Sequence, residues 1–120
     1  MSEMKNNEWI DLIETTELSS LQEGEFYPFE MEKENGDIVT FLLIKYNAAD
    51  KPWIALENIC PHDGGHLEDG EVDLKHCSIS CARHGAAFNL ENGKVLSMPA
   101  STDIKSYPVR IKNNILQIAL

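Results

Sequence analysis

Two short segments, ICPHDGGH at residues 59–66 and SCARHGAAF at residues 80–88, decide how this sequence is interpreted. Each pairs a cysteine with a histidine, and eighteen residues separate the two pairs. Thiolate and imidazole are common protein ligands of iron and zinc. Glycines follow both pairs, and glycine lets a backbone bend closely around a metal centre. The segments therefore predict one metal centre, with four candidate ligands: Cys60, His62, Cys81 and His84.

Other chemistries also use cysteine and histidine. A zinc finger typically has two cysteines followed by two histidines, whereas the order here is Cys-His and then Cys-His. A closed zinc site with this order remains an alternative. Catalysis by a cysteine requires one nucleophile beside one base, and two similar pairs do not favour it.

Composition supports one globular domain. The chain has 120 residues, 42% of them apolar and 25% charged, which suits a single folded unit. Its three cysteines are an odd number, so a disulfide framework is not expected. The longest apolar run, Phe41–Ile44, is too short to span a membrane. Residues 1–7 lack the apolar core of a signal peptide, and we expect a cytoplasmic protein.

The net charge of −10 is unevenly distributed. Residues 1–37 hold eleven acidic residues and two lysines, whereas residues 38–120 are nearly balanced. No basic footprint for phosphates is present, so nucleic acid is not an expected partner. The acidic residues either attract a partner with a basic docking patch or only keep the protein in solution.

The remaining pattern is one of short strands between turns, so the expected fold class is all-β. Asn35-Gly36 and Asn92-Gly93 predict tight turns, Pro28 favours an edge strand, and a single helical turn capped by Thr15 or Thr16 is expected over residues 16–22. Residues 58–98 show no strand pattern and read as an irregular functional region. The expected strands are 9–13, 26–31, 38–46, 53–57, 107–111 and 115–118.

The paired segments resemble the Rieske signature, Cys-x-His followed by Cys-x-x-His. ENICPHDGGHLEDGEV (57–72) is similar to the first cluster loop of that family, and ISCARHGAAFNLENGKV (79–95) is similar to the second. MPASTDIKSYPVRIKNNILQI (98–118) resembles the proline loop and final strands of Rieske ferredoxins.

This resemblance implies a fold and a cofactor. The fold would be three stacked antiparallel sheets in a single domain, 1–120, with an inserted cluster-binding subdomain at about 58–100. The cofactor would be a [2Fe–2S] cluster. Cys60 and Cys81 would hold one iron, and His62 and His84 the other. The electron would settle on the histidine-ligated iron and leave through the imidazoles.

The resemblance also implies a low reduction potential. High-potential members carry a disulfide between the loops, but Gly65 and Arg83 stand at those positions. They also carry Ser and Tyr hydroxyls near the cluster, where this chain has Ala86 and Phe88. Rieske potentials span roughly −150 to +300 mV, and we expect a value near the bottom of that range.

The implied function is that of a stand-alone ferredoxin, which carries one electron and is not itself an enzyme. Its partners would be a flavin reductase as donor and an oxygenase or another redox protein as acceptor. Two alternatives are an accessory protein of iron–sulfur assembly and the small subunit of an assimilatory nitrite reductase. A third is a binding module in which zinc only staples the loops.

Several other residues have plainer interpretations. Cys77 is expected to be a buried strand cysteine rather than a ligand, and His66 and His76 to be solvated. Trp9 and Trp53 are expected in the core. Arg83 is a candidate for tuning the cluster or for docking, or a plain surface charge. A group of acidic residues follows the first pair and would steer a partner or remain solvated: Asp63, Glu68, Asp69, Glu71 and Asp73.

Overall fold

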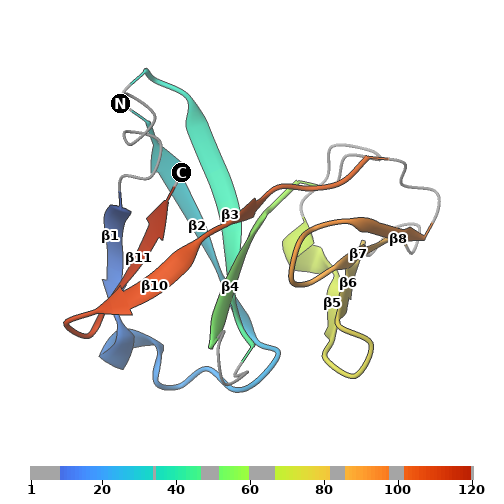
Figure 1. Ribbon diagram of the computed structural model, residues 1–120, viewed down its shortest axis with the longest axis horizontal. Helices are drawn as coiled ribbons and strands as arrows, with labels where there is room; N and C mark the ends of the chain where they lie inside the picture. The colour runs from blue at the N-terminus through green and yellow to red at the C-terminus, as the bar shows by residue number, and fades with distance from the viewer. Residues whose placement is uncertain are drawn as a thin grey trace.

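The computed structural model describes residues 9–33, 35–46, 52–59, 67–81, 86–97 and 102–119. These residues form three antiparallel sheets and two short 3-10 helices (Figure 1). The all-β prediction and the three-sheet arrangement are therefore confirmed. In the described residues, no helix is long and apolar enough to cross a membrane.

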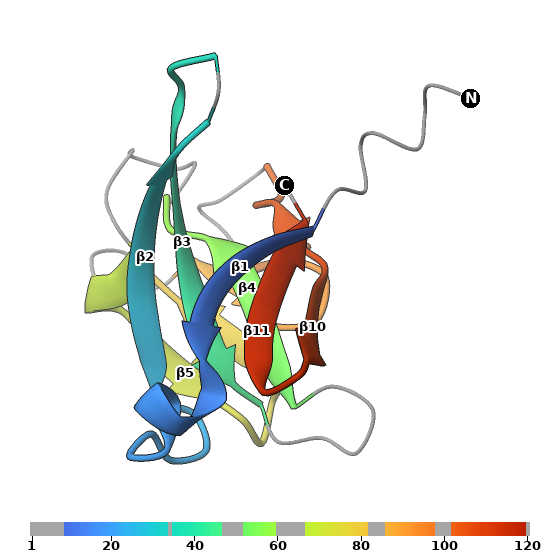
Figure 2. The ribbon, with the colours of Figure 1, turned by 90° about the vertical axis from the view of Figure 1, so that its left-hand side faces the viewer.

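The first sheet joins the two ends of the described chain. Its order is β1–β11–β10, where β1 is Trp9–Glu14, β10 is Val109–Lys112 and β11 is Ile115–Ala119 (Figure 2). Asn113 and Asn114 connect β10 to β11 with φ values of 55° and 66°. Asparagine tolerates this left-handed conformation, which a two-residue hairpin turn requires, and the strands expected at 107–111 and 115–118 pair as a hairpin.

The second sheet has the order β2–β3–β4–β9. Its strands are β2 (Phe26–Glu32), β3 (Ile38–Lys45), β4 (Trp53–Glu57) and β9 (Ser106–Tyr107). The strand that carries Pro28, β2, lies at an edge as predicted, and β3 is central. Gly36, at the predicted turn before β3, has a φ of +94°.

The third sheet corrects one prediction, because it lies within the region that was expected to be irregular. Its order is β5–β6–β7–β8. Each strand has only three residues: Glu71–Asp73, Ser78–Ser80, Ala87–Asn89 and Val95–Ser97. Strands this short carry almost no periodic signal, so only pairing and packing define them.

The helical turn was predicted in nearly the right place but with the wrong cap. The 3-10 helix η2 spans Thr15–Leu18, with Glu14 at its N-cap position and no side-chain cap hydrogen bond. Leu18 is buried, so packing of this side chain holds the turn. The second helix, η3, spans Leu67–Asp69.

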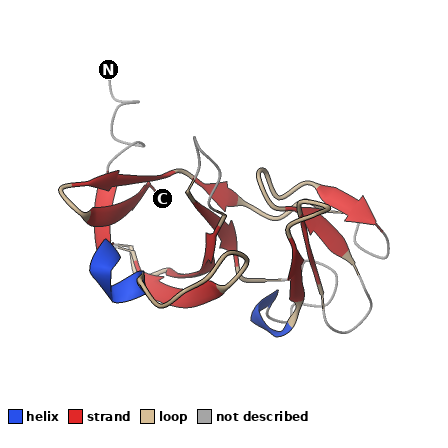
Figure 3. Cartoon of the chain, turned by 90° about the horizontal axis from the view of Figure 1, so that it is seen from below, coloured by secondary structure: helices blue, strands red, loops and turns tan. Residues whose placement is uncertain are grey.

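The first and second sheets, here called the base, lie beside the third sheet (Figure 3). Strand β3 of the base contributes to the cores on both of its faces. Its residues Phe41–Ile44 are fully buried. Leu42 and Ile44 belong to the core cluster that contains the third sheet's apolar residues. Leu43 and Phe41, on the other face, belong to the two clusters between the first and second sheets. Successive side chains of a strand point to opposite faces, so one apolar run serves both cores.

Candidate metal centre

Of the four predicted ligands, the structure describes Cys81. Cys60, His62 and His84 lie outside the described residues, as do His66, Asp63, Gly65 and Arg83. Cys81 directly follows β6, is 5% exposed and forms no disulfide. Its side chain belongs to the core cluster beneath the third sheet. Cysteine thiolate is a common metal ligand, and Cys81 has a free thiol for that role.

The second Cys-His segment is closed by the backbone. The Cys81 N–H donates to the Ala86 carbonyl at 2.7 Å. This hydrogen bond continues the ladder between β6 and β7, in which Ser80 faces Ala87. The chain therefore enters and leaves this loop at adjacent points.

The first Cys-His segment is closed by side chains. Asn58 follows β4, and Glu68 lies in η3, ten residues later. The Asn58 Nδ2 donates to Glu68 Oε1 at 2.7 Å, and the Glu68 N–H donates to Asn58 Oδ1 at 3.0 Å. Glu68, expected only as part of an acidic group, is thus tied to a buried amide.

The end of the first segment touches the start of the second at Gly70. A Cβ at this position would lie 1.8 Å from the Ser80 carbonyl oxygen and 3.2 Å from the Leu67 carbonyl oxygen. Only glycine permits so close an approach. Since Ser80 precedes Cys81, the Gly70 contact fixes the end of the first segment against the start of the second.

Cys81 belongs to an apolar core cluster. Five fully buried residues of that cluster are here called the apolar floor: Leu67, Ile79, Ala86, Phe88 and Leu90. In β7, Phe88 lies between Ile79 of β6 and Val95 of β8. Neither Ala86 nor Phe88 brings a hydroxyl group to this floor.

Cys77 differs from its prediction. It is half-buried in the turn between β5 and β6, with a φ of 52°, rather than in a strand. It does pack against the core cluster as a small apolar residue. Its Sγ lies 3.1 Å from the Tyr46 hydroxyl, which donates to Glu91 Oε2 at 2.7 Å. In the contact between Cys77 and Tyr46, either group can be the donor. These bonds, first to Cys77 and then to Glu91, hold the Tyr46 pKa well above its usual range.

The predictions for His76 and Trp53 are confirmed, and the prediction for Trp9 is not. His76 is exposed, and its Nδ1 lies 2.7 Å from Asp73 Oδ2. This contact lowers the pKa of Asp73. Trp53 is buried as expected. Trp9 is only half-buried, with the Arg110 guanidinium 4.3 Å above its ring, so its assignment to the core was wrong.

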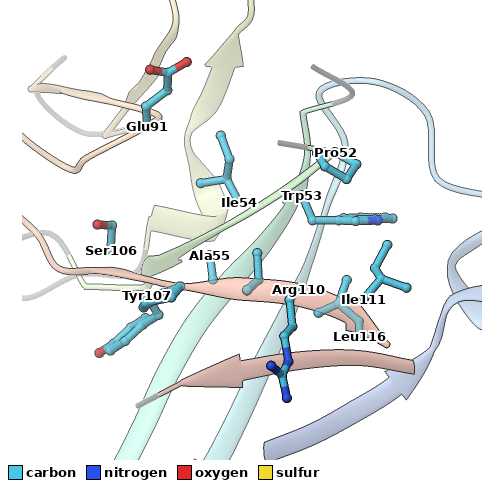
Figure 4. Close-up of a pocket in the computed structure, with 12 residues that line it drawn as sticks. Pro52, Trp53, Ile54, Ala55, Glu91, Ser106, Tyr107, Arg110, Ile111 and Leu116 are labelled. Carbon is cyan, nitrogen blue, oxygen red and sulfur yellow. The ribbon is translucent and has the colours of Figure 1, made fainter. Parts of the chain in front are cut away.

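A separate pocket of about 630 Å³ lies between β4, β10 and the turn that follows β7 (Figure 4). Trp53, Ile54 and Ala55 line it together with Glu91 and Arg110. Cys81, the predicted ligand that the structure describes, is not among the lining residues that belong to the described part of the chain.

The fold and the paired segments agree with a known family. Residues 8–108 match the sequence profile of the Rieske [2Fe–2S] domain. The chain belongs to the Rieske [2Fe–2S] domain family. Membership implies a [2Fe–2S] cluster, and the donors in the two Rieske segments, two thiols and two imidazoles, suit one.

Curated relatives are ferredoxin components. The chain is 37% identical over 59 residues to the ferredoxin component of the naphthalene 1,2-dioxygenase/salicylate 5-hydroxylase systems of Ralstonia sp. The matched residues make up 49% of this chain and 55% of that protein. It is 30% identical over 71 residues to a 3-phenylpropionate/cinnamic acid dioxygenase ferredoxin subunit of Photorhabdus laumondii, covering 59% and 67%. Such matches span about half to two thirds of the relatives' length.

Solved structures share the whole fold. The Sphingomonas yanoikuyae B1 ferredoxin has a TM-score of 0.67 and 26% identity to this chain. The comparison covers 94% of this chain and 99% of the other. The similarity therefore extends over both the base sheets and the third sheet.

The contact at Gly70 yields a first prediction. Gly70→Ala forces the backbone at residue 70 away from Ser80, because the added Cβ meets the Ser80 carbonyl rather than a flexible side chain. We expect a loss of about 1–3 kcal/mol in the free energy of unfolding, together with less iron per chain. Denaturant unfolding and iron analysis measure both. Gly36→Ala is the control, since no atom lies within 4 Å of its Cβ. It should be strained at its φ of +94° yet keep its iron. Full iron content in folded Gly70→Ala would contradict the prediction.

A second prediction concerns Cys77. In Cys77→Ser the hydroxyl can replace the thiol as the hydrogen-bond partner of Tyr46, so visible and EPR spectra should match those of wild type. Cys81→Ser is the matched variant, four residues later, and should lose the spectra. A changed g tensor in Cys77→Ser would show that Cys77 contacts the cluster.

Proposed function

We propose that this protein is a one-electron carrier that holds a Rieske [2Fe–2S] cluster through Cys60, His62, Cys81 and His84. The carrying observation is the convergence of the two segment ends, where Gly70 touches Ser80 beside the buried thiol of Cys81. Such convergence favours one shared centre over two separate sites. The proposal treats residues 1–120 as one domain with a cluster-binding subdomain at about 58–100.

The bound cluster would supply storage of a single electron at a defined potential. The chain's own residues would set that potential. Neutral imidazoles leave the centre less negative than four thiolates would, which raises the potential relative to the roughly −400 mV of plant-type ferredoxins. The apolar floor with Ala86 and Phe88 offers no hydroxyl donors, which keeps the value low within the Rieske range.

We propose that the partners are redox proteins, with a flavin reductase as donor and an oxygenase as acceptor. The ferredoxin components named among the relatives support this proposal. A cytoplasmic location is proposed with it. The alternatives in nitrite reduction, in iron–sulfur assembly and as a zinc-stapled module predict other partners or another metal. Reduction by a flavin reductase, followed by electron transfer to a purified oxygenase, tests the main proposal directly.

The ligand set yields a third prediction. Purified protein should contain about two irons and two sulfides per chain and, when reduced, show an EPR signal with a low average g value. Cys60→Ser and Cys81→Ser should each abolish the signal and destabilise the fold, because metal binding and folding are coupled. Iron, sulfide and zinc analysis provides the measurement. Stoichiometric zinc without iron would refute the proposal.

The apolar floor yields a fourth prediction. Reduction adds negative charge, so a hydroxyl that donates to a cluster or ligand sulfur stabilises the reduced form more. Hydrogen bonds to charged groups contribute roughly 1.5–3 kcal/mol, and about 1.4 kcal/mol corresponds to about 59 mV for one electron. Ala86→Ser and Phe88→Tyr should therefore each raise the potential by tens of millivolts, with an upper bound of roughly 65–130 mV.

Matched controls exist in the base. Ala55→Ser and Phe41→Tyr place the same hydroxyl groups at fully buried positions of the second sheet, and neither should change the potential. Redox titration in one buffer compares all five proteins. Equal shifts in the base variants, or a wild-type potential well above 0 mV, would overturn the argument.

A further inference from the structure

The two segments are closed by different means. This difference points to a role for two residues outside the Cys-x-His and Cys-x-x-His signature. The second segment has a backbone hydrogen bond between Cys81 and Ala86 within a strand ladder. The first has the reciprocal pair of hydrogen bonds between Asn58 and Glu68. We call these two residues the loop clasp.

Asn58 is held through both its side chain and its backbone. Its side chain is 2% exposed, and it is the only buried polar or charged residue in the described part of the chain. Its own N–H donates to the Thr40 carbonyl of β3 at 3.0 Å. A buried amide without its partners costs stability, so the carboxylate and the N–H of Glu68 are held to one orientation.

Glu68 is anchored by its neighbours. Leu67 beside it is fully buried, and the Gly70 N–H donates to the Leu67 carbonyl at 2.8 Å. Gly70 in turn abuts Ser80. The clasp therefore connects the end of β4 to the entrance of the second segment through a short, continuous series of contacts.

We propose that Asn58 and Glu68 are positioning residues for the cluster. They would set the separation between the ends of the first segment and so orient Cys60 and His62. This inference rests on the ligand set proposed above. Residues that orient metal ligands typically change metal affinity by roughly 10–100-fold when altered.

An exchange of the amide and the carboxylate tests the clasp. In Asn58→Asp, two carboxylates face each other and the donor to Glu68 Oε1 is lost. In Asn58→Asp/Glu68→Gln, the new amide can donate to the introduced carboxylate while the residue-68 N–H still donates to the other oxygen of that carboxylate, so complementarity returns. Glu68→Gln alone keeps an acceptor for Asn58 Nδ2. If Asn58→Asp does not fold, Glu68→Ala takes its place as the test variant, because it removes the acceptor for Asn58 Nδ2. Glu68→Gln is then the conservative variant with which Glu68→Ala is compared.

The readouts are the rate of iron release to excess chelator and the g values of the reduced protein. We expect Asn58→Asp to release iron roughly 10–100-fold faster and to show shifted g values, with both restored in the double variant. Asp69→Asn removes one negative charge, as Glu68→Gln does, but at the next residue. It should behave as wild type. Leu116→Ala truncates a fully buried side chain of the base, and should lower the thermal midpoint without shifting the g values.

The outcomes separate this inference from the proposed function. Wild-type release rates and g values in Asn58→Asp, or a double variant as impaired as Asn58→Asp, would overturn the clasp. So would equal g shifts in Leu116→Ala. The proposed function is judged on the wild type alone, by its iron and its EPR signal. If the wild type held zinc instead, that function would fail, and the same ratios of zinc release would still decide the clasp.

Discussion

The alternation of strand β3 is the constraint on which the rest of the structure depends. Phe41–Ile44 are fully buried and face alternately into the base clusters and into the cluster beneath the third sheet. A strand that is apolar on both faces must be covered on both. The third sheet, with its three-residue strands, could not bury enough apolar surface alone. The third sheet is stabilised because it packs against the apolar side chains of β3 and β4 on the face that points away from the first sheet.

This dependence explains which elements the sequence could predict. The base strands are long enough to carry β-branched and aromatic residues, and their turns carry Asn-Gly or Asn-Asn pairs, so strand type and position were recognisable. The strands of the third sheet were missed because they are defined by their pairing with one another and by their packing against β3. Cys77 was assigned to a strand for the same reason. Its φ of 52° reflects a turn geometry that a cysteine does not signal.

The candidate site divides in a similar way. The Cys-His spacing and the family signature were visible in the sequence, since metal ligands are rare residue types at specific intervals. The supporting contacts were not. Asn58 and Glu68 are ten residues apart, with no strand or helix period to relate them, and Glu68 resembled any other acidic residue. Gly70 could be recognised as special only once Ser80 was found against it.

The pairing of β1 with β11 bears on how the chain folds during synthesis. Trp9 pairs with Ala119, and Gln117 donates to Asp11 while accepting from Arg110. Strand β1 thus has its partner in β11, at the other end of the described residues, and the Arg110 guanidinium over Trp9 joins the same two regions. Contacts of such high sequence separation form slowly. On the ribosome, the strands of the second and third sheets emerge before β11, and the base is completed only when β11 follows.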